Sequence, residues 1–342
     1  MKKHMVLMLV AVLVVAWTSS PHGQGGDSNY KPRRINKMIE LLEDGQTVFD
    51  ISVSGAGYDD GKKLATSQVD LIQYQMEHGP VDFIRLREFM QGLVDGGPTK
   101  SGHRTPAVIV TLPFVGLDAA MVRANHWVVE QILSAGVHGI MLCHARNAEA
   151  VSEFVRTARY QFARAGVKDH GIAEGLRGNG NQAYAARIWG ISNIEYTEKA
   201  DPWPMNPNGE LVLSLKMEDK HSLANIEQIT KVPGISWGEW GPGDQAMSIK
   251  GLAYMKAGGG QGRTGAASAK TLGLPPIGDE ELDAARTRIM TAMKANGIFP
   301  LHGTTDENVI DLIKAGIRVT HAGNDLVRTN KAREFTKRRM PY

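Results

Sequence analysis

Two acidic residues, Glu218 and Asp244, stand just beyond short apolar runs of the sequence. Glu218 follows the run 211–215 and Asp244 follows the run 232–237, and both runs have the composition of buried strands. The segment between them, 220–231, carries apolar residues at helical spacing, as expected of a crossover between two parallel strands. We therefore predict that the two carboxylates lie side by side, where they would form an oxygen-rich half-site for Mg²⁺ or Mn²⁺.

His78 is the candidate proton carrier. It follows the apolar run 71–76 in the sequence Glu-His-Gly-Pro, so it is also expected at a strand end. An isolated histidine in such a loop is usually a hydrogen-bonded surface residue, and an aspartate after Gly-Pro-Gly is more often a turn former or a helix cap than a metal ligand. A histidine beside two metal-binding carboxylates is instead suited to move a proton. The three residues together are more specific than any one of them.

Strands and helices alternate along the chain. Eight apolar runs are predicted as strands: 47–53, 71–76, 107–112, 139–143, 211–215, 232–237, 298–301 and 318–321. Amphipathic segments are predicted as helices: 34–42, 83–93, 119–135, 148–163, 280–295 and 307–315. Eight strands alternating with helices in one domain favour a (β/α)₈ TIM barrel over an open sheet. The loops that follow the strands of such a barrel share one rim, where active sites lie.

Composition limits the functions of the chain. Its 342 residues, of which 42% are hydrophobic, are enough for the core of one such barrel. A net charge of +3 without a long basic run argues against a nucleic-acid-binding face. Cys143 is the sole cysteine of the sequence, which excludes an internal disulfide and a cysteine-ligated zinc cluster. Its apolar neighbours predict an inert buried thiol.

The N-terminus has the layout of a secretory leader. Lys2, Lys3 and His4 precede an apolar stretch at 5–17, and small and polar residues follow. This stretch is shorter than the about 20 residues that a membrane helix needs. We therefore expect residues 1–26 to be a signal peptide and leader, with a retained membrane anchor as the alternative. The mature protein would be a single barrel domain at 30–342, exported to the periplasm or secreted.

Two segments do not fit a minimal barrel. Residues 197–210, rich in proline and asparagine, are expected to form an exposed loop. The glycine-rich segment 258–265 has a G-x-G-x-x-G spacing, but no apolar strand precedes it and no acidic residue follows at the distance that a dinucleotide site needs. We interpret this segment as a loop.

Seven sequence blocks carry a family resemblance. They are NKMIELLEDGQTVF, EHGPVDFIRL, AGVHGIMLCHARNAEAVSEFVRTARY, GLRGNGNQAYAARIWG, LSLKMEDKHSLANIEQITKVPGI, GPGD and KAGIRVTHAGNDL. In order and spacing they resemble the HpcH/HpaI aldolase and citrate lyase family, the metal-dependent class II pyruvate aldolases. The resemblance covers most of the chain after the leader. It implies a TIM barrel that binds Mg²⁺ or Mn²⁺ and a pyruvate-type substrate.

The resemblance also implies roles for the candidate residues. Glu218 and Asp244 match the acids that hold the metal ion, which pyruvate would chelate through its keto oxygen and its carboxylate. The cation would polarise the carbonyl and stabilise the enolate that forms when a C–C bond breaks. His78 matches the acid/base histidine of the family.

Two further segments match substrate-binding parts of the family. The backbone at Gly241, Pro242 and Gly243, just before the second metal acid, would bind the pyruvate carboxylate. Arg177 matches a Gly- and Arg-containing segment near the substrate entrance.

Two positions depart from the family pattern. Gln75 stands where the family usually has an aspartate, and an amide can orient His78 but cannot stabilise its charged form as a carboxylate does. The family also has an arginine at the end of the third strand, whereas this chain offers only Ile109 or Thr111 there. A missing cation at an oxyanion site normally costs orders of magnitude in rate.

Lys216 offers a compensation for the missing arginine. It lies two residues before Glu218, so strand alternation places both side chains on the face toward the barrel centre. Lys216 would then supply the positive charge, unless it pairs with a rim acid such as Asp219. An interior lysine with a lowered pKa could also form a Schiff base with a keto acid, although two metal-binding acids beside it argue against that chemistry.

Three more histidines follow predicted strands. His302 and His321, near the ends of the seventh and eighth strands, face the rim by position and could contact a polar substrate. His144, just after the fourth strand, is interpreted as structural or subunit-facing.

These residues predict a divalent-metal-dependent C–C lyase that cleaves a 4-hydroxy-2-oxo acid to pyruvate, or a related 2-oxo acid, and an aldehyde. Its partners would be these small molecules and not nucleic acid, and the resemblance implies a homo-oligomer, a hexamer or a trimer of dimers. One alternative is an exported barrel that binds 2-oxo acids without turning them over. Another is a lyase re-tuned for a substrate other than pyruvate.

Overall fold

The computed structural model describes residues 26–342 except 28, 163, 165, 257–278 and 324–325. The predicted leader 1–26 lies outside the described residues except for Gly26, and so does the glycine-rich segment 258–265. Within the described part of the chain, no helix has the length and apolar character to cross a bilayer.

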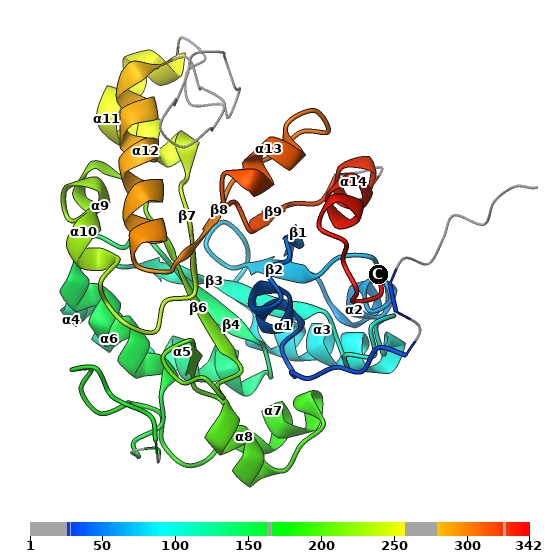
Figure 1. Ribbon diagram of the computed structural model, residues 1–342. Coiled ribbons are helices and arrows are strands. Elements are labelled where there is room, and N and C mark those ends of the chain that lie inside the picture. The colour runs from blue at the N-terminus through cyan, green and yellow to red at the C-terminus, as the bar shows by residue number, and fades with distance from the viewer. Residues whose placement is uncertain (1–25, 28, 163, 165, 257–278, 324–325) are drawn as a thin grey trace, which may run out of the picture.

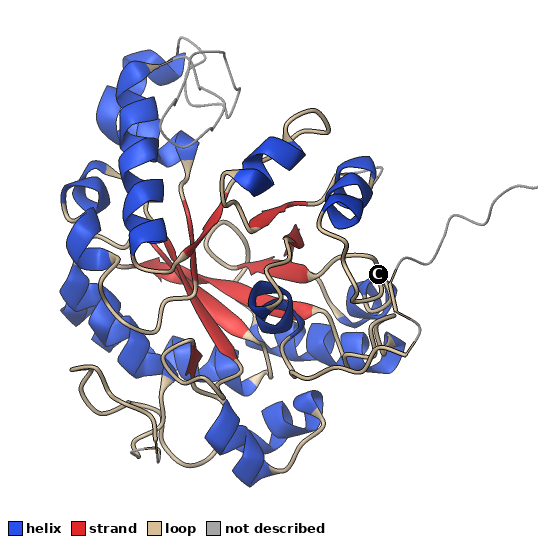
Figure 2. Ribbon diagram, viewed as in Figure 1, coloured by secondary structure: helices blue, strands red, loops and turns tan. Residues whose placement is uncertain are grey.

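Within the described residues, eight parallel strands close into a barrel (Figures 1 and 2). They are β1 (Val48–Ser54), β2 (Leu71–Gln75), β3 (Ala107–Val115), β4 (Gly139–Cys143), β6 (Leu211–Lys216), β7 (Trp237–Glu239), β8 (Phe299–Leu301) and β9 (Val319–His321). The pairing of β4 with β6 and of β9 with β1 closes the ring, and the two-residue β5 (Pro202–Trp203) adds to β6. The predicted (β/α)₈ barrel is confirmed.

Helices surround the barrel, as Figure 2 shows in blue. They are α1 (Lys37–Glu43), α2 (Tyr58–Leu64), α3 (Phe83–Gly96), α4 (Ala119–Ala124), α5 (His126–Ser134), α6 (Ala148–Ala158), α7 (Gln182–Trp189), α8 (Asn193–Lys199), α9 (Lys220–Ala224), α10 (Ile226–Ile229), α11 (Pro242–Lys256, interrupted at Gly251), α12 (Glu280–Ala295), α13 (Val309–Lys314) and α14 (Val327–Phe335). Several begin where an Asp or Asn side chain accepts hydrogen bonds from the first turn, among them α3 at Asp82 and α9 at Asp219. These caps fix where each loop after a strand must end.

Two predicted helices are each divided in the structure. The segment 119–135 breaks at Asn125 and the segment 220–231 breaks at Asn225, and both asparagines leave the helical conformation. The amide of Asn125 donates to the carbonyl of Met121 at 2.9 Å, and that of Asn225 to the carbonyl of Arg146 at 2.8 Å. Such side-chain bonds to carbonyls compete with the helical ladder, which apolar periodicity alone does not reveal.

The strand predicted at 232–237 begins later than expected. Pro233 and Gly234 form a turn in which Gly234 has a φ of 94°, a conformation that glycine adopts without strain. The strand itself is Trp237–Glu239, and Glu239 pairs in register with Lys216 on β6. Glu239 is therefore a strand residue that faces the barrel interior, a position that the sequence pattern missed.

The segment 197–210 is buried rather than an exposed loop. Trp203 is 8% exposed and stacks on Phe299, with ring centroids 6.2 Å apart. Asp201 is fully buried and accepts hydrogen bonds from Arg159 at 2.9 Å and from Asn206 at 3.0 Å. The asparagine that suggested a loop instead forms a tight turn against the barrel.

The barrel interior is apolar where the strands begin and polar where they end. The apolar part contains Val48, Leu71, Ala107, Ile109, Met141, Val212, Trp237, Leu301 and Val319, and α1 covers it with Met38, Leu41 and Leu42. Two to four residues further along the strands lie Asp50, Gln73, Lys216 and Glu239. The polar side chains thus line the end where (β/α)₈ enzymes place their active sites.

His138 is a buried histidine at the start of β4, remote from the polar end. Its Nδ1 accepts a hydrogen bond from the Val108 N–H at 3.2 Å, and its ring stacks on Trp189. Burial lowers the pKa of His138 to about 3 from 6.5. Because the folded pKa lies below the unfolded one, the unfolded chain binds the extra proton between these values. Stability from this group is therefore present above pH 6.5 and is lost as the pH falls toward 3.

We predict that His138→Asn flattens the pH dependence of unfolding. The asparagine oxygen keeps an acceptor for Val108 but cannot titrate, so the variant should lose less stability than the parent below pH 6.5. The difference is at most about 1.4 kcal/mol per pH unit. Urea unfolding followed by circular dichroism from pH 7 to 4 measures it. His126→Asn, at the surface of α5, is the control, and parallel curves for His138→Asn and the parent would contradict the assignment.

Candidate active site

Glu77, His144 and Glu218 converge at the polar end of the barrel. They follow β2, β4 and β6, and one potential ligand atom from each lies within 4.8 Å of the others. Two carboxylates and an imidazole at this spacing form a donor set that suits a divalent cation. We refer to these three residues as the acid–histidine cluster.

Glu218 shows the strongest sign of a missing positive partner. It is 1% exposed, and its Oε1 has no hydrogen-bond partner among the described residues. Burial raises the pKa of Glu218 to about 8, although Lys216 and His144 act to lower it. A buried carboxylate without a partner is costly, and a cation at Oε1 would remove that cost. The residues present therefore fit a metal ion.

His144 is held in place by Asp219. Its Nδ1 lies 3.2 Å from Asp219 Oδ2, and its Nε2 lies 3.7 Å from Glu218 Oε1. Asp219 also accepts a hydrogen bond from Arg146 Nε at 2.8 Å, and that bond anchors the carboxylate. The backbone of His144 has a φ of 47°, a strained value for a non-glycine residue. A carboxylate behind a histidine that faces a candidate metal position is the arrangement that orients metal-binding imidazoles.

His144 lies closer to the candidate site than its sequence position indicated. We expected a structural or subunit-facing residue, whereas the ring belongs to the acid–histidine cluster. The hydrogen bond that Asp219 accepts from His144 is the main cause of the raised pKa of His144. The available signal was the position of His144 directly after one strand and of Asp219 directly after Glu218.

Lys216 is a positively charged side chain that faces the barrel interior. Its Nζ lies 2.5 Å from Glu77 Oε2, so its partner is Glu77 and not Asp219. Burial acts to lower the pKa of Lys216, but the charges of Glu239 and Glu218 outweigh it and hold that pKa well above its usual value. A charged lysine is a poor nucleophile, which weakens the Schiff-base alternative. Cys143 is fully buried with a raised pKa, in accord with an inert thiol.

Gly241 lets the chain pass directly against Glu218. A Cβ at this position would lie 2.0 Å from Glu218 Oε2 and 3.0 Å from its Cβ. Pro242 takes the first position of α11 and has no N–H to donate, so donors to a carboxylate would have to come from its neighbours. Gly243 and Asp244 lie in the first turn of α11. The charge of Asp244 contributes to the raised pKa of His144, so Asp244 stands near the cluster without being one of its three members.

His78 lies at the rim, and its side chain is loosely held. Its side chain is 68% exposed, and its Nε2 lies 3.4 Å from Glu77 Oε2. Gln75 is engaged elsewhere, since its Oε1 accepts from Thr111 at 2.9 Å and its Nε2 donates to Ser52 at 3.4 Å. Thr111 lies within β3, four residues before the strand ends at Val115, and pairs in register with Gln75. Thr111 and Ile109 are both uncharged, so neither candidate position on the third strand supplies the cation of the family.

Arg177 lies at the opposite end of the barrel. Its guanidinium donates to the Tyr196 hydroxyl at 3.1 Å, and that hydroxyl donates to the carbonyl of Leu133, just before β4 begins. It also lies over the ring of Tyr160, 4.2 Å from the centroid. Helices α7 and α8 of this region lie at the lower end of Figure 1, opposite α11. Within one chain, Arg177 therefore does not approach Glu218.

The two later histidines have different surroundings. His302 is buried with its Nε2 3.2 Å from Arg286 Nη1, and burial lowers its pKa to about 4. It sits between β8 and α12, outside the barrel interior. His321 instead bonds to Asp50 on β1 at the rim.

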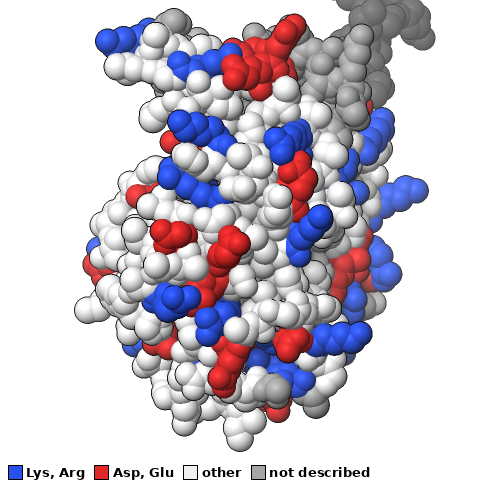
Figure 3. Space-filling view, turned by 90° about the vertical axis from the view of Figure 1, so that its left-hand side faces the viewer, with Lys and Arg blue, Asp and Glu red and all other residues white. Residues whose placement is uncertain are grey.

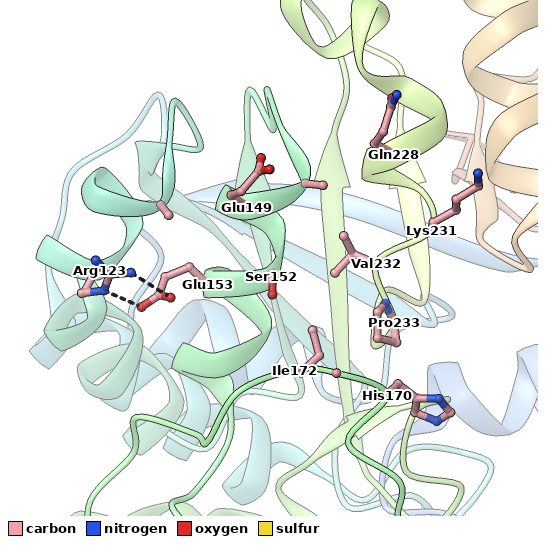
Figure 4. Close-up of a pocket in the computed structure, with 13 residues that line it drawn as sticks. Arg123, Glu149, Ser152, Glu153, His170, Ile172, Gln228, Lys231, Val232 and Pro233 are labelled. Atoms are coloured by element: carbon pink, nitrogen blue, oxygen red, sulfur yellow. Dashed lines mark hydrogen bonds and ion pairs between the residues drawn. The ribbon is translucent and has the colours of Figure 1, made fainter.

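A groove on the outer surface is separate from this site. Figure 4 shows it between α6, which carries Glu149 and Glu153, and the segment after α10, which carries Lys231 and Pro233. The ion pair of Arg123 with Glu153 borders it. On this side of the molecule acidic and basic side chains are interspersed over the part that the structure describes (Figure 3). The groove carries none of the candidate site residues.

Comparisons with known proteins give sequence relatives. No protein-family profile matches the chain. The hydroxypyruvate/pyruvate aldolase of Roseobacter denitrificans is 26% identical over 220 residues, which are 64% of this chain and 71% of that protein. The enzyme of the same name from Roseovarius nubinhibens is 25% identical over 243 residues, 71% of this chain and 73% of that protein.

Solved structures give the same fold. An HpcH/HpaI aldolase/citrate lyase family protein from Burkholderia cenocepacia superposes with a TM-score of 0.61 at 18% identity and covers 88% of this chain and 98% of that one. Macrophomate synthase superposes with a TM-score of 0.55 at 19% identity over 90% of each chain. The resemblance predicted from the sequence is therefore confirmed: this chain is a homologue of hydroxypyruvate/pyruvate aldolases and has the fold of the HpcH/HpaI aldolase/citrate lyase family.

Proposed function

We propose that the protein is a divalent-metal-dependent aldolase. It would cleave a 4-hydroxy-2-oxo acid to pyruvate, or a related 2-oxo acid, and an aldehyde, or catalyse the reverse addition. The observation that carries this proposal is the buried Oε1 of Glu218, which has no hydrogen-bond partner among the described residues and lies within the acid–histidine cluster. The name of the sequence relatives, hydroxypyruvate/pyruvate aldolase, supports a 2-oxo acid as the donor.

Glu218 would hold the ion with His144 and Glu77, and Asp244 approaches from α11. A bound Mg²⁺ or Mn²⁺ would polarise the keto group of the substrate and so favour the enolate. Lys216 adds a second positive charge to the same wall of the barrel. Gly241 and Gly243 leave room for a substrate carboxylate at the start of α11, where backbone N–H groups favour anions.

The surroundings of His78 favour one alternative, a protein that binds 2-oxo acids without turning them over. His78 has no carboxylate behind it, and Gln75 is bonded to Thr111 and Ser52 instead. A barrel that binds 2-oxo acids without turnover would show this weakened acid/base position. Such a protein would bind pyruvate in the presence of metal but would not exchange its methyl protons.

We further propose that the protein is exported and forms a homo-oligomer. The leader-like residues 1–26 support export. Exposed apolar side chains on and before α3 and on α5 support association, with Ile84 73% exposed, Trp127 52% and Val81 50%.

We predict that the protein exchanges the methyl protons of pyruvate with solvent only when Mn²⁺ or Mg²⁺ is present. Proton NMR in D₂O follows the loss of the methyl signal, and excess EDTA should stop it. Glu218→Gln should reduce the rate to that of the protein-free solution, because it removes the charge that holds the ion. Bound pyruvate without exchange in the parent protein would favour the binding-protein alternative.

Gly241→Ala should weaken metal binding without unfolding the barrel. The new Cβ would collide with the Glu218 carboxylate and displace it, for an expected loss of about 10-fold or more in Mn²⁺ affinity. Electron paramagnetic resonance of free Mn²⁺ measures this affinity directly. Gly303→Ala is the matched control, because Gly303 also follows a strand and its Cβ would meet nothing within 4 Å. Equal affinities of the two variants would contradict the assignment of Glu218.

Lys216→Met should lower the exchange rate by about 10²-fold, the usual cost of one lost group that stabilises developing negative charge. Lys220→Met, at an exposed position of α9, should leave the rate unchanged. If Lys216→Met exchanges as fast as the parent while Glu218→Gln does not exchange, Lys216 has no part in charge stabilisation. Borohydride with pyruvate should not label Lys216, and covalent trapping there would establish the Schiff-base route instead.

A further inference from the structure

A second polar group lies across the barrel from the acid–histidine cluster. The ring runs β1, β2, β3, β4, β6, β7, β8, β9, so β1 stands opposite β6 and β9 stands opposite β4. Asp50 is on β1 and His321 ends β9, and the two are paired in register. They therefore face Glu218 and His144 across the mouth. The interior of an eight-stranded barrel is wide enough for side chains or one small ligand, so a small molecule between the two walls would contact both.

A hydrogen bond between His321 and the buried Asp50 holds the histidine ring in place. Asp50 is fully buried, and its Oδ1 lies 2.9 Å from His321 Nδ1. Its Oδ2 accepts a hydrogen bond from Gln73 Nε2, which fixes the carboxylate from the neighbouring strand. The His321 side chain is 48% exposed, in keeping with its place at the rim. Because Nδ1 faces Asp50, Nε2 is the nitrogen that can exchange a proton with a ligand.

This dyad has what His78 lacks. An acid/base histidine works best when a carboxylate fixes its orientation and stabilises its charged form. His78 has a contact of 3.4 Å from its Nε2 to Glu77 Oε2, and the neutral Gln75 supplies no charge. Besides the pair of Asp219 with His144, an aspartate–histidine pair stands on β1 and β9, whereas the histidine after β2 has none.

We propose that His321 is a catalytic acid/base residue that acts on the oxygen of the aldehyde half of the substrate, with Asp50 as its positioning residue. The proposal rests on the aldolase function proposed above and names the group that handles the second reacting centre.

In the direction of addition, one C–C bond forms and one proton moves from His321 to the substrate. The enolate carbon of the 2-oxo acid attacks the carbonyl carbon of the aldehyde, and a C–C bond forms. The electron pair of the aldehyde C=O bond moves to its oxygen, which takes the proton from His321 Nε2 and becomes the 4-hydroxyl. The enolate returns to the ketone. In cleavage His321 takes the hydroxyl proton, and the same bonds break and form in reverse.

The charges around His321 suit the donor role. The hydrogen bond to Asp50 and its charge raise the pKa of His321 to about 9, so the ring carries its proton at neutral pH. The groups that face it are Asp50 from β1, Glu239 from β7, His302 from β8 and Arg328 from α14. Glu239 adds to the effect of Asp50, whereas Arg328 opposes it. Addition should therefore decline above about pH 9, as His321 loses its proton.

Two assays on the same Mn²⁺-loaded protein separate this role from the enolate step. Proton NMR follows methyl exchange of pyruvate alone, and a second experiment follows consumption of pyruvate with glycolaldehyde. His321→Asn, which keeps a donor toward Asp50, should reduce the addition by about 10²-fold or more and leave methyl exchange within about twofold. Equal loss of both rates, or no loss of either, overturns the proposal. Absence of Mn²⁺-dependent exchange in the parent protein would instead refute the aldolase function itself.

Asp50→Asn tests the positioning role. It keeps the shape of the side chain but removes the charge, so the pKa of His321 should return toward 6.5 and the upper limb of the pH profile of addition should move down by at least about one unit. Ser52→Ala, the next inward-facing residue of β1, is the control and should keep the profile of the parent. An unshifted limb in Asp50→Asn contradicts a role of Asp50 in setting the proton affinity of His321.

Discussion

The interaction on which the site depends is the enclosure of Lys216 by carboxylates. Strand alternation forces Lys216 and Glu218 to face the same interior, and the register of β6 with β7 adds Glu239 beside them. Glu77 completes the set with a 2.5 Å contact to the lysine. With all groups ionised, three carboxylates against one ammonium leave a formal charge of −2 in a barrel whose other half is wholly apolar. Such an excess is costly in a low-dielectric interior. Burial is the main cause of the raised pKa of Glu218, and the charges of Glu77 and Glu239 add to it. A divalent cation would cancel the excess, so these electrostatics favour metal binding.

Carboxylates also fix the two histidines that face each other across the mouth. Asp219, anchored by Arg146, holds His144, and Asp50, anchored by Gln73, holds His321. Each aspartate is buried, so each hydrogen bond is made where water does not compete for it. The two pairs would stand on either side of a small molecule bound at the mouth, and fixed acid/base groups meet a reacting atom at the correct distance. His78, exposed and loosely held, belongs to neither pair.

The periodicity of the sequence was enough to predict the barrel, the order of its strands and the rim position of Glu218, because strand and helix periods are local properties. It misplaced β7, since Pro233 and Gly234 turn the first half of an apolar run, and it missed the break at Asn125. Asp50 and Glu239 were missed for a common reason. Asp50 meets His321, which the sequence did place at the rim, across 271 positions of sequence, and Glu239 meets Lys216 only through inter-strand register. The stagger of the strands in the closed barrel decides which inward-facing residues lie at the same height along the barrel axis. No local sequence pattern encodes this stagger. The place of Arg177 within the chain could not be predicted for the same reason, because a glycine-rich segment gives no indication of the end of the barrel to which it returns.

The positions of charge in this barrel imply a definite orientation of the substrate. The third strand offers only Ile109 or Thr111 where the family resemblance led us to expect a cation, and the Thr111 hydroxyl is bonded to Gln75. The cation stands instead on β6, next to the candidate metal ligands, and the carboxylate-backed histidine stands on β9. Negative charge that develops on the donor ketone would therefore be stabilised on the β6 side, and the oxygen of the acceptor would face β1 and β9. Because Asp50, Gln73, Lys216 and Glu239 form one continuous polar layer, a change of one of these residues alone would leave a buried charge unpaired. Under the proposed mechanism, Lys216 and His321 would supply the positive charge and the carboxylate-backed histidine that the third strand and Gln75 do not provide.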